Sequence, residues 1–240
     1  MLLAAFIGMA WAPFQQLPAG DRLYRFGEQL VEWLLSGQTD PLMARINPKA
    51  DNNRKEIIAM SVLNTLSQLK QAGLTSNTLL LNVLQEPVTK DKDTLQALYL
   101  PLLAGDRILT LKIERIKPVA DSFYVDGPLR LGLPKADEEL TAGYKIFRTK
   151  CYGCHGKFAQ GTALAPNLTD DYWKYVRNEE DLFKVISDGK PGTMMIEYKN
   201  YLTQQQINQV VKYINLMHGQ RLVEGNPPEG EYVVFDRHVY

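Results

Sequence analysis

The sequence predicts a mainly α protein in two parts, with a short β-hairpin at the end of the first part. Apolar residues recur at helical spacing over 21–36 and 53–72. The spacing changes to strict alternation over 109–113, which is typical of a half-buried strand. Helical spacing returns after 126–136, a segment with several Gly and Pro residues that we interpret as a linker between two domains.

The first domain is expected over residues 21–125. Each of three expected helices begins at a residue whose side chain can accept a backbone hydrogen bond; these residues are Asp21, Ser76 and Asp91. A further helix is expected over 53–72, ending at Gly73. The alternating strand 109–113 is expected to pair with Ser122–Val125. The region has no cluster of ligand-type residues and no Gly-rich phosphate loop. We therefore interpret it as a helical or α+β domain of unknown role, whose apolar stripes form an ordinary core; docking onto a partner subunit is the weaker alternative.

The second domain, residues 137–218, is expected to be helical. Its expected helices span 140–149, 170–175, 179–187 and 203–217. Thr203 can cap the last of these, and Gln206 follows three residues later, as in a capping box. The tail, residues 219–240, is rich in Pro and Gly and is expected to run extended over the surface.

The overall composition excludes one broad class of function. Hydrophobic residues make up 45% of the chain and charged residues 22%, as in ordinary globular proteins. Lys+Arg and Asp+Glu both number 27, so the formal net charge is zero. A general basic surface for nucleic acid is therefore absent, and no nucleic-acid partner is predicted.

Residues 1–20 are expected to be a signal peptide or the stub of a membrane anchor. Met1–Phe14 is apolar and uncharged, but it is shorter than the roughly 20 residues that a membrane-spanning helix needs. A signal-peptide core fits this length, with cleavage near Leu17-Pro18-Ala19. A buried N-terminal segment is the alternative. The first interpretation predicts a bacterial protein in the periplasm or at the outer face of the cytoplasmic membrane.

The most informative motif is Cys151-Tyr152-Gly153-Cys154-His155, which contains the only two cysteines of the chain. C-x-x-C-H is the attachment pattern of haem c. The two thiols add to the two vinyl groups of the porphyrin, and the adjacent imidazole becomes the proximal iron ligand. The sequence therefore predicts one covalent haem c, bound by Cys151, Cys154 and His155.

Three other uses of a C-x-x-C pair explain fewer features of this sequence. A thioredoxin-like dithiol expects a surrounding βαβ pattern, whereas this motif stands between predicted helices. A zinc site needs a fourth ligand beyond two Cys and one His. A structural disulfide would close too short a loop to stabilise the chain much. The sequence favours haem over all three.

A second axial ligand is expected from a methionine, because a Met/His pair suits an electron-transfer haem. Met194 and Met195 follow a Lys-Pro-Gly-Thr loop that precedes the last predicted helix, and Met195 is the predicted ligand. His218 is the second candidate. Pro166 is the candidate carbonyl acceptor for the other ring N–H of His155, since a ligating imidazole is normally held by such a bond.

These motifs together resemble the small monohaem class I cytochromes c. Gly143 and Phe147, the CYGCH string, APNL and PGTMMI occur in the order seen in that family, and PGTMMI resembles the PGTKMI loop that supplies the axial methionine. The resemblance implies a helical fold around one haem, with the first helix crossing the last. It would place Gly143 and Phe147 against Tyr213, and it maps the ligand to Met195.

A narrower resemblance points to the dihaem subunit of bacterial cbb-type terminal oxidases. Residues 165–173, APNLTDDYW, resemble the PNLTD-x-x-W run of its cytochrome c domains, and the GNPP of residues 225–228 resembles their tail. The sequence departs from that subunit by having one haem motif, by Ile196 where Pro usually follows the methionine, and by its N-terminal half.

The predicted function is electron transfer by a c-type cytochrome with one His/Met-ligated haem. A subunit or relay of a respiratory, oxidase-type complex is the preferred form, and the chain is at most a non-catalytic part of an oxidoreductase. A freely diffusing periplasmic carrier and a haem enzyme with a dissociable Met195 are the alternatives. The expected partners are redox proteins, including subunits of a membrane respiratory complex, and no small-molecule substrate is predicted.

Two groups near the motif have open interpretations. Trp173 and Tyr172 either flank a haem propionate or are core aromatics. Four basic residues near the cysteines either steer an acidic redox partner or form a solvated face; they are Lys145, Arg148, Lys150 and Lys157.

Overall fold

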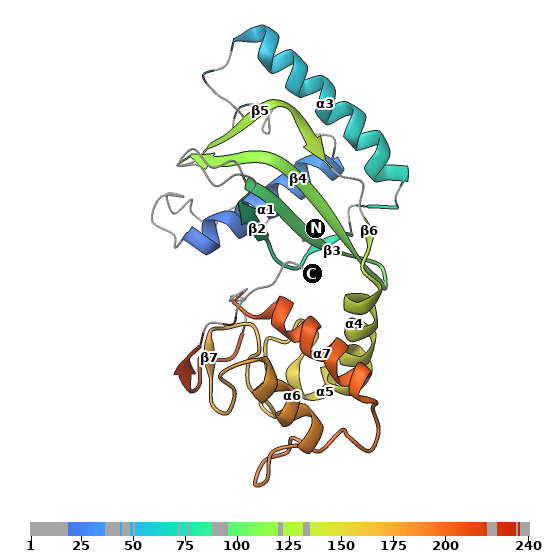
Figure 1. Ribbon diagram of the computed structural model, residues 1–240, viewed down its shortest axis with the longest axis vertical. Helices are drawn as coiled ribbons and strands as arrows, with labels where there is room; N and C mark the ends of the chain where they lie inside the picture. Colours follow the sequence, from blue (N-terminus) through green and yellow to red (C-terminus); the bar gives the residue numbers. More distant parts are fainter. Residues whose placement is uncertain are drawn as a thin grey trace, which may run out of the picture.

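The chain folds into a sheet region and a helical region that stand end to end (Figure 1). The computed structural model describes residues 19–36, 44, 49, 51–71, 73–75, 77–87, 96–119, 122–131, 135–219, 225–233 and 235. The segment predicted to be a signal peptide or anchor lies outside these residues except for its last two positions. Within the described part of the chain, no helix is both long enough and apolar enough to cross a membrane.

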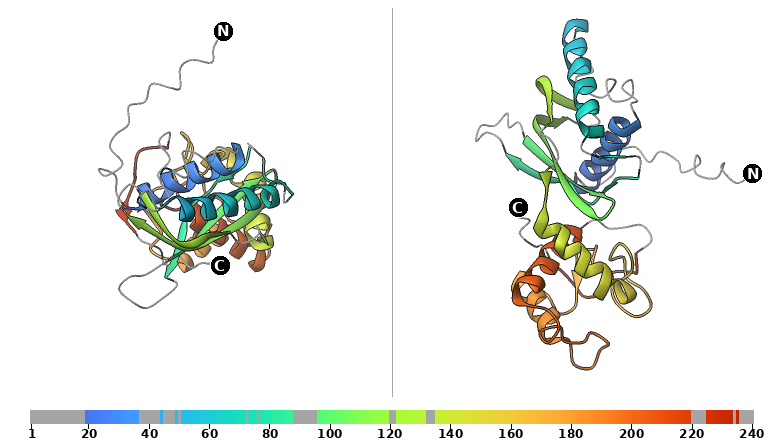
Figure 2. Two further views of the ribbon diagram at one scale, coloured as in Figure 1. Left: turned by 90° about the horizontal axis from the view of Figure 1, so that it is seen from above. Right: turned by 90° about the vertical axis from the view of Figure 1, so that its right-hand side faces the viewer.

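The sheet region consists of two helices and one antiparallel sheet. The helices are α1 (Ala19–Ser36) and α3 (Asn52–Gln71). The strands are β1 (Leu79–Leu80), β2 (Leu84–Pro87), β3 (Gln96–Ala104), β4 (Arg107–Val119), β5 (Ser122–Leu131) and β6 (Lys135–Ala136). The strand order is β1-β3-β4-β5, with β2 also paired to β3 and β6 to β4. Both helices cover the same face of the sheet (Figure 2).

Alternating leucines explain why β3 is a strand. Leu98, Leu100 and Leu102 are fully buried in the core that α1 and α3 share with the sheet. A spacing of two places all three on one face of a strand. Pro101 between them would interrupt a helix, but it is accommodated in β3, opposite Thr110 of β4.

Two predictions for this region are wrong. The Leu-rich helices expected after Ser76 and Asp91 are replaced by β1, β2 and β3; both expected cap residues lie outside the described residues. Leucine has a good helix propensity, but tertiary pairing with β4 overrides it. The region is therefore α+β, with a six-stranded sheet in place of the short β-hairpin that was expected. Ser122–Val125 does pair with β4, but with residues 116–119, whereas 109–113 pairs mainly with β3. The predicted partnership of the two strands is therefore confirmed, and the predicted register is wrong.

The predicted linker over 126–136 also differs from the structure. The second half of β5 and the short strand β6 occupy most of it, and both pair with β4. Asp137 then links the two regions directly: its backbone N–H donates to Ile108 O at 2.9 Å, and its carboxylate caps the next helix through Leu140 N. Gly127 and Pro128 thus lie within β5, whereas Gly132 and Pro134 lie outside the described residues.

The helical region follows the predicted helices closely. Its elements are α4 (Glu138–Lys150), α5 (Tyr152–His155), β7 (Tyr172–Trp173), α6 (Glu179–Asp188), α7 (Gln204–Met217) and β8 (Glu231–Tyr232). The predicted capping box of Thr203 and Gln206 is present at the start of α7. The helix expected over 170–175 is wrong, because Tyr172 and Trp173 pair with Tyr232 and Glu231 instead.

Helix α4 crosses α7 at close range, as the family resemblance implies. A Cβ on Gly143 would lie 2.0 Å from the backbone oxygen of Gln209, so only glycine fits at the crossing. The rings of Phe147 and Tyr213 pack beside it, with their centroids 5.2 Å apart. Both side chains are about 1% exposed. The crossing lies in a second hydrophobic core, distinct from the one that α1 and α3 share with the sheet.

The two regions share that second core. Leu81, Leu84, Leu103 and Ile108 come from the sheet region but pack with the helices of the other region. At the same junction the buried Asn82 donates its side-chain amide to Leu216 O at 2.8 Å. The sheet region is therefore attached to the helical region by packing as well as by the chain.

Candidate haem site

The cysteine motif forms a single tight turn at the end of α4. Cys151 ends α4 and begins α5, and its carbonyl accepts from Cys154 N at 3.2 Å and His155 N at 2.9 Å. This turn brings both thiols and the imidazole to the same cavity. Neither cysteine is in a disulfide.

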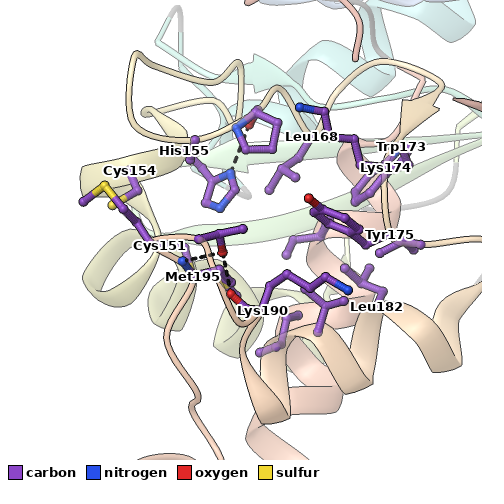
Figure 3. A pocket seen from close by; sticks show the side chains of 18 of the residues that line it. Cys151, Cys154, His155, Leu168, Trp173, Lys174, Tyr175, Leu182, Lys190 and Met195 are labelled. Carbon is purple, nitrogen blue, oxygen red and sulfur yellow. Dashed lines mark hydrogen bonds between the residues drawn. The ribbon is translucent and has the colours of Figure 1, made fainter. Parts of the chain in front are cut away.

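The cavity has a volume of about 240 Å³, several times the ~30 Å³ that one water molecule occupies in the liquid. Apolar side chains make up most of its walls, including Leu168, Leu182, Val185, Ile186 and Ile214. Figure 3 shows Cys151 and Cys154 at one end of the cavity and Trp173, Lys174 and Tyr175 towards the other. His155 and Met195 both line the cavity near its cysteine end.

His155 is oriented by the loop that follows it. Its Nδ1 lies 3.1 Å from Pro166 O, and because a carbonyl can only accept, Nδ1 carries the proton. Burial lowers the pKa of His155, and the bond to Pro166 opposes this shift only in part. The imidazole is therefore neutral, with the lone pair of Nε2 available to a metal.

Met195 is held in its place by a short, hydrogen-bonded loop after α6. Lys190 N donates to Met195 O at 2.9 Å, and Met195 N donates to Thr193 Oγ1 at 3.1 Å. Gly189 has a φ of +69°, and a Cβ there would lie 2.8 Å from Met195 O. Met195 is half-buried against the core, whereas Met194 is 65% exposed.

The end of the cavity away from the cysteines has a cationic and polar lining. Lys174 forms an ion pair with Glu229. The Nζ of Lys190 lies 4.2 Å from the centroid of the Tyr175 ring. Trp173 is 6% exposed, and its indole N–H donates to Asp170 O at 3.2 Å. Lys174, Tyr175 and Lys190 were not predicted as site residues. Their positions in the sequence could have indicated them, because Lys174 and Tyr175 follow Trp173 directly and Lys190 begins the loop before Met195.

The Cys151 thiol differs from the reactive thiol of a redox-active dithiol. Burial, with a smaller contribution from Cys154, raises the pKa of Cys151 to about 12. Dithiol oxidoreductases depend on a lowered thiol pKa, so this environment does not suit that chemistry. Among the residues that the structure describes, no group of three or more His, Cys, Asp or Glu side chains is placed to hold a metal ion.

His218, the second candidate ligand, packs in the core of the helical region. It is 1% exposed and lies against Phe235, with ring centroids 4.4 Å apart. Its Nε2 lies 3.7 Å from Asp171 Oδ1. His218 does not line the cavity. Trp173 lies between His218 and the cavity in the packing, since it lines the cavity and also packs against His218.

The basic residues near the motif are not all on the cavity. Lys150 lines it, while Lys145 forms an ion pair with Asp106 of the sheet region at 3.5 Å. The guanidinium of Arg148 lies 6.0 Å from the centroid of the Tyr144 ring. Lys157 lies over Phe158. Tyr172 is 41% exposed and packs edge-on against Tyr232, and it also lines the cavity.

Comparison with known proteins agrees with this site. Residues 138–214 match the family described as "Cytochrome C oxidase, cbb3-type, subunit III". The chain is 32% identical to the cbb3-type cytochrome c oxidase subunit CcoP of Rhodobacter capsulatus, over 54% of this chain and 44% of that one. It is 40% identical to the FixP subunit of Bradyrhizobium sp. (strain ORS 278), over 39% of this chain and 32% of that one.

Two cytochromes of another kind are also similar. Cytochrome c-L of Methylorubrum extorquens is 40% identical over 31% of this chain and 38% of its own length. A solved structure of cytochrome cL from Methylophaga aminisulfidivorans is 39% identical over 32% of this chain and 52% of its own, with a TM-score of 0.31. The chain spans less than half the length of each of the curated relatives named here.

The helical region is thus a cytochrome c domain, the class that binds haem c covalently. It resembles the cytochrome c domains of the dihaem subunit of cbb-type oxidases. The cavity fits such a group, because two thiols, a neutral imidazole and a thioether surround an apolar space with a cationic end.

Proposed function

We propose that this chain carries single electrons through one haem c, covalently bound by Cys151 and Cys154 and ligated by His155 and Met195. The observation that supports this most strongly is the convergence of all four side chains on one apolar cavity. A single pair of cysteines in the sequence supports one haem rather than two.

When bound, haem c supplies one-electron redox chemistry to the protein. The two cysteines tether the group, and His155 presents Nε2 because Pro166 holds its other ring nitrogen. Met195 lines the same cavity and would supply a thioether ligand, which raises the potential of a His-ligated iron. The apolar walls exclude water and so disfavour the more highly charged oxidation state.

The far end of the cavity is suited to the carboxylates of a haem. Lys190 provides positive charge there, Lys174 adds an ammonium group that is paired with the carboxylate of Glu229, and Tyr175 provides a phenolic hydroxyl. Trp173 contributes an apolar wall, since its N–H already donates to Asp170. We therefore assign Lys174, Tyr175 and Lys190 to the carboxylates and Trp173 to the ring.

Replacing the methionine ligand tests the proposal. Met195→Ala should abolish the methionine–iron charge-transfer band of the oxidised protein and lower the midpoint potential, because the thioether is lost. Met194→Ala is the matched control, since Met194 is mostly exposed, and it should keep both properties. An unchanged band in Met195→Ala would contradict the assignment of the ligand.

We further propose that the chain is a subunit or relay of a respiratory, oxidase-type complex, in the periplasm or at the outer face of the membrane. The similarity to CcoP and FixP supports this, as does a sheet region that is fixed to the cytochrome domain by a common core. Purification from the native membrane should recover the chain with respiratory subunits. Recovery of a monomer without detergent would indicate a diffusing carrier.

A further inference from the structure

The C-terminal segment Gly225–Val233, here called the strap, lies along the haem cavity and contacts two of its walls. Asn226 lies at one end of the strap and makes four hydrogen bonds to the loop that follows His155. Its N–H donates to Gln160 O at 2.8 Å, and its carbonyl accepts from Asn167 Nδ2 at 3.3 Å. Its side-chain amide donates to Thr162 O at 2.6 Å and to Ala165 O at 3.3 Å.

These bonds join the two sides of a narrow loop. Thr162 and Ala165 form an isolated β-bridge, and Asn226 donates to the carbonyl oxygens of both. Gly161 has a φ of +84°, and a Cβ there would lie 2.8 Å from Asn226 Nδ2, so the loop is shaped to admit the amide. Pro166, which follows directly, carries the carbonyl that accepts from His155.

The other end of the strap is attached to the far wall of the cavity. Its strand β8 pairs with β7, which carries Trp173. A Cβ on Gly230 would lie 2.3 Å from the backbone carbon of Trp173, so the two chains are in close contact. Val233 N donates to Asp171 O at 2.8 Å. The strap therefore fixes the position of Asn226 relative to the cavity.

We propose that Asn226 is a positioning residue for His155, acting through the loop 160–167; this rests on the function proposed above. A carbonyl that orients a ligating imidazole must itself be held, and outer partners of a metal ligand affect metal binding or activity about 10–100-fold. The amide of Asn226 has two N–H donors, which match the two carbonyl oxygens that it meets. Without these donors the loop would move, and the imidazole plane would move with Pro166.

The test uses the full haem-loaded chain with Asn226→Asp, which keeps the size of the side chain but removes both donors. Asn208→Asp is the matched control, because Asn208 is exposed on α7 and the change of charge is the same. Two properties are measured by NMR. The hyperfine-shifted haem methyl resonances of the oxidised protein report the orientation of the axial imidazole, and hydrogen exchange reports opening of the loop at the amides of Gly161 and Thr162.

Asn226→Asp should change the pattern of haem methyl shifts and accelerate exchange at Gly161 and Thr162 about ten-fold or more, while Asn208→Asp changes neither. Asn226→Ser, which keeps one donor, should give a smaller change of the same kind, and it decides the question if the Asp variant does not accumulate. Wild-type shifts in these variants, or faster exchange at all amides alike with unchanged shifts, would overturn the proposal.

A failure of the proposed function has a different signature. A wild-type chain without covalent haem would contradict that function directly. In such a chain the Nδ1–H resonance of His155 and the exchange rates at Gly161 and Thr162 still decide whether Asn226 positions the imidazole.

Discussion

The sheet region and the helical region of this chain differ in how their side chains are used. All residues that line the haem cavity come from the helical region and the strap, between Lys150 and Glu229. The sheet region instead contributes apolar side chains to the core below it and a buried amide, that of Asn82, to the end of α7. The chemistry is thus concentrated in one region, while the other provides a fixed support.

The comparison teaches that the two regions are distinct in chemistry but continuous in packing. An independent second domain would contact the cytochrome domain through an exposed, mostly polar interface. Here Leu103 and Ile108 are buried at the junction, and Ile108 N donates to the hydroxyl of Thr141 on α4 at 2.9 Å. We therefore expect the two regions to unfold together.

The largest expected effect is on covalent haem attachment in the helical region. Replacing both cysteines, with Cys151→Ala and Cys154→Ala, should remove all haem that survives denaturing extraction, because no other thiol exists in the chain. Tyr152→Phe is the control, since Tyr152 is an exposed residue between the two cysteines, and it should keep the haem. Haem that stays attached in the double variant would contradict the site.

A substitution of the glycine at the helix crossing tests the packing of α4 against α7. Gly143→Ala should lower the free energy of unfolding by about 3 kcal/mol, because its Cβ would meet the backbone of α7. Gly153→Ala should change it by less than about 0.5 kcal/mol, because a Cβ there meets no atom within 4 Å. Denaturant titration measures both, and equal effects would disprove the crossing.

The amide at the junction tests whether the two regions are coupled. Asn82→Ala should destabilise the protein by about 1–3 kcal/mol, because a buried hydrogen bond is lost. The transition followed by haem absorbance should shift together with the transition followed by far-ultraviolet circular dichroism. The exposed Asn77→Ala is the control. A shift in circular dichroism alone would show that the regions are independent.

The smallest expected effect is at the first residue of the helical region. Asp137→Ala removes the cap of α4 and should lower the free energy of unfolding by about 1 kcal/mol. Asp137→Asn keeps an acceptor and should stay close to the wild type. Thermal unfolding followed by circular dichroism separates the two, and an equal loss in both variants would assign the effect to charge rather than to capping.

The parts of the fold that local sequence determines were predicted well. The capping box of Thr203 acts within three residues and was predicted. The cap at Asp137 is equally local but was not predicted, and α4 begins before the expected Leu140. The C-x-x-C-H motif and the loop before Met195 are each recognisable locally; that they line one cavity was expected because a haem needs a second ligand and because the family resemblance implies it.

The missed parts depend on partners far along the chain. The alternation of Leu98, Leu100 and Leu102 becomes a strand because β4 pairs with it, although leucine by itself favours a helix. Trp173 is in a strand because the strap supplies β8. The contacts of Asn226 were missed for the same reason: a Pro-rich tail gives no local sign of the loop that it will meet.

The central claim is one covalent haem per chain, and intact-mass measurement of the natively matured protein under denaturing conditions tests it most directly. The account predicts the mass of the mature polypeptide plus one haem, with the spectrum of a c-type haem. A colourless protein with the mass of its amino acids alone, or a mass that includes two haems, would contradict it.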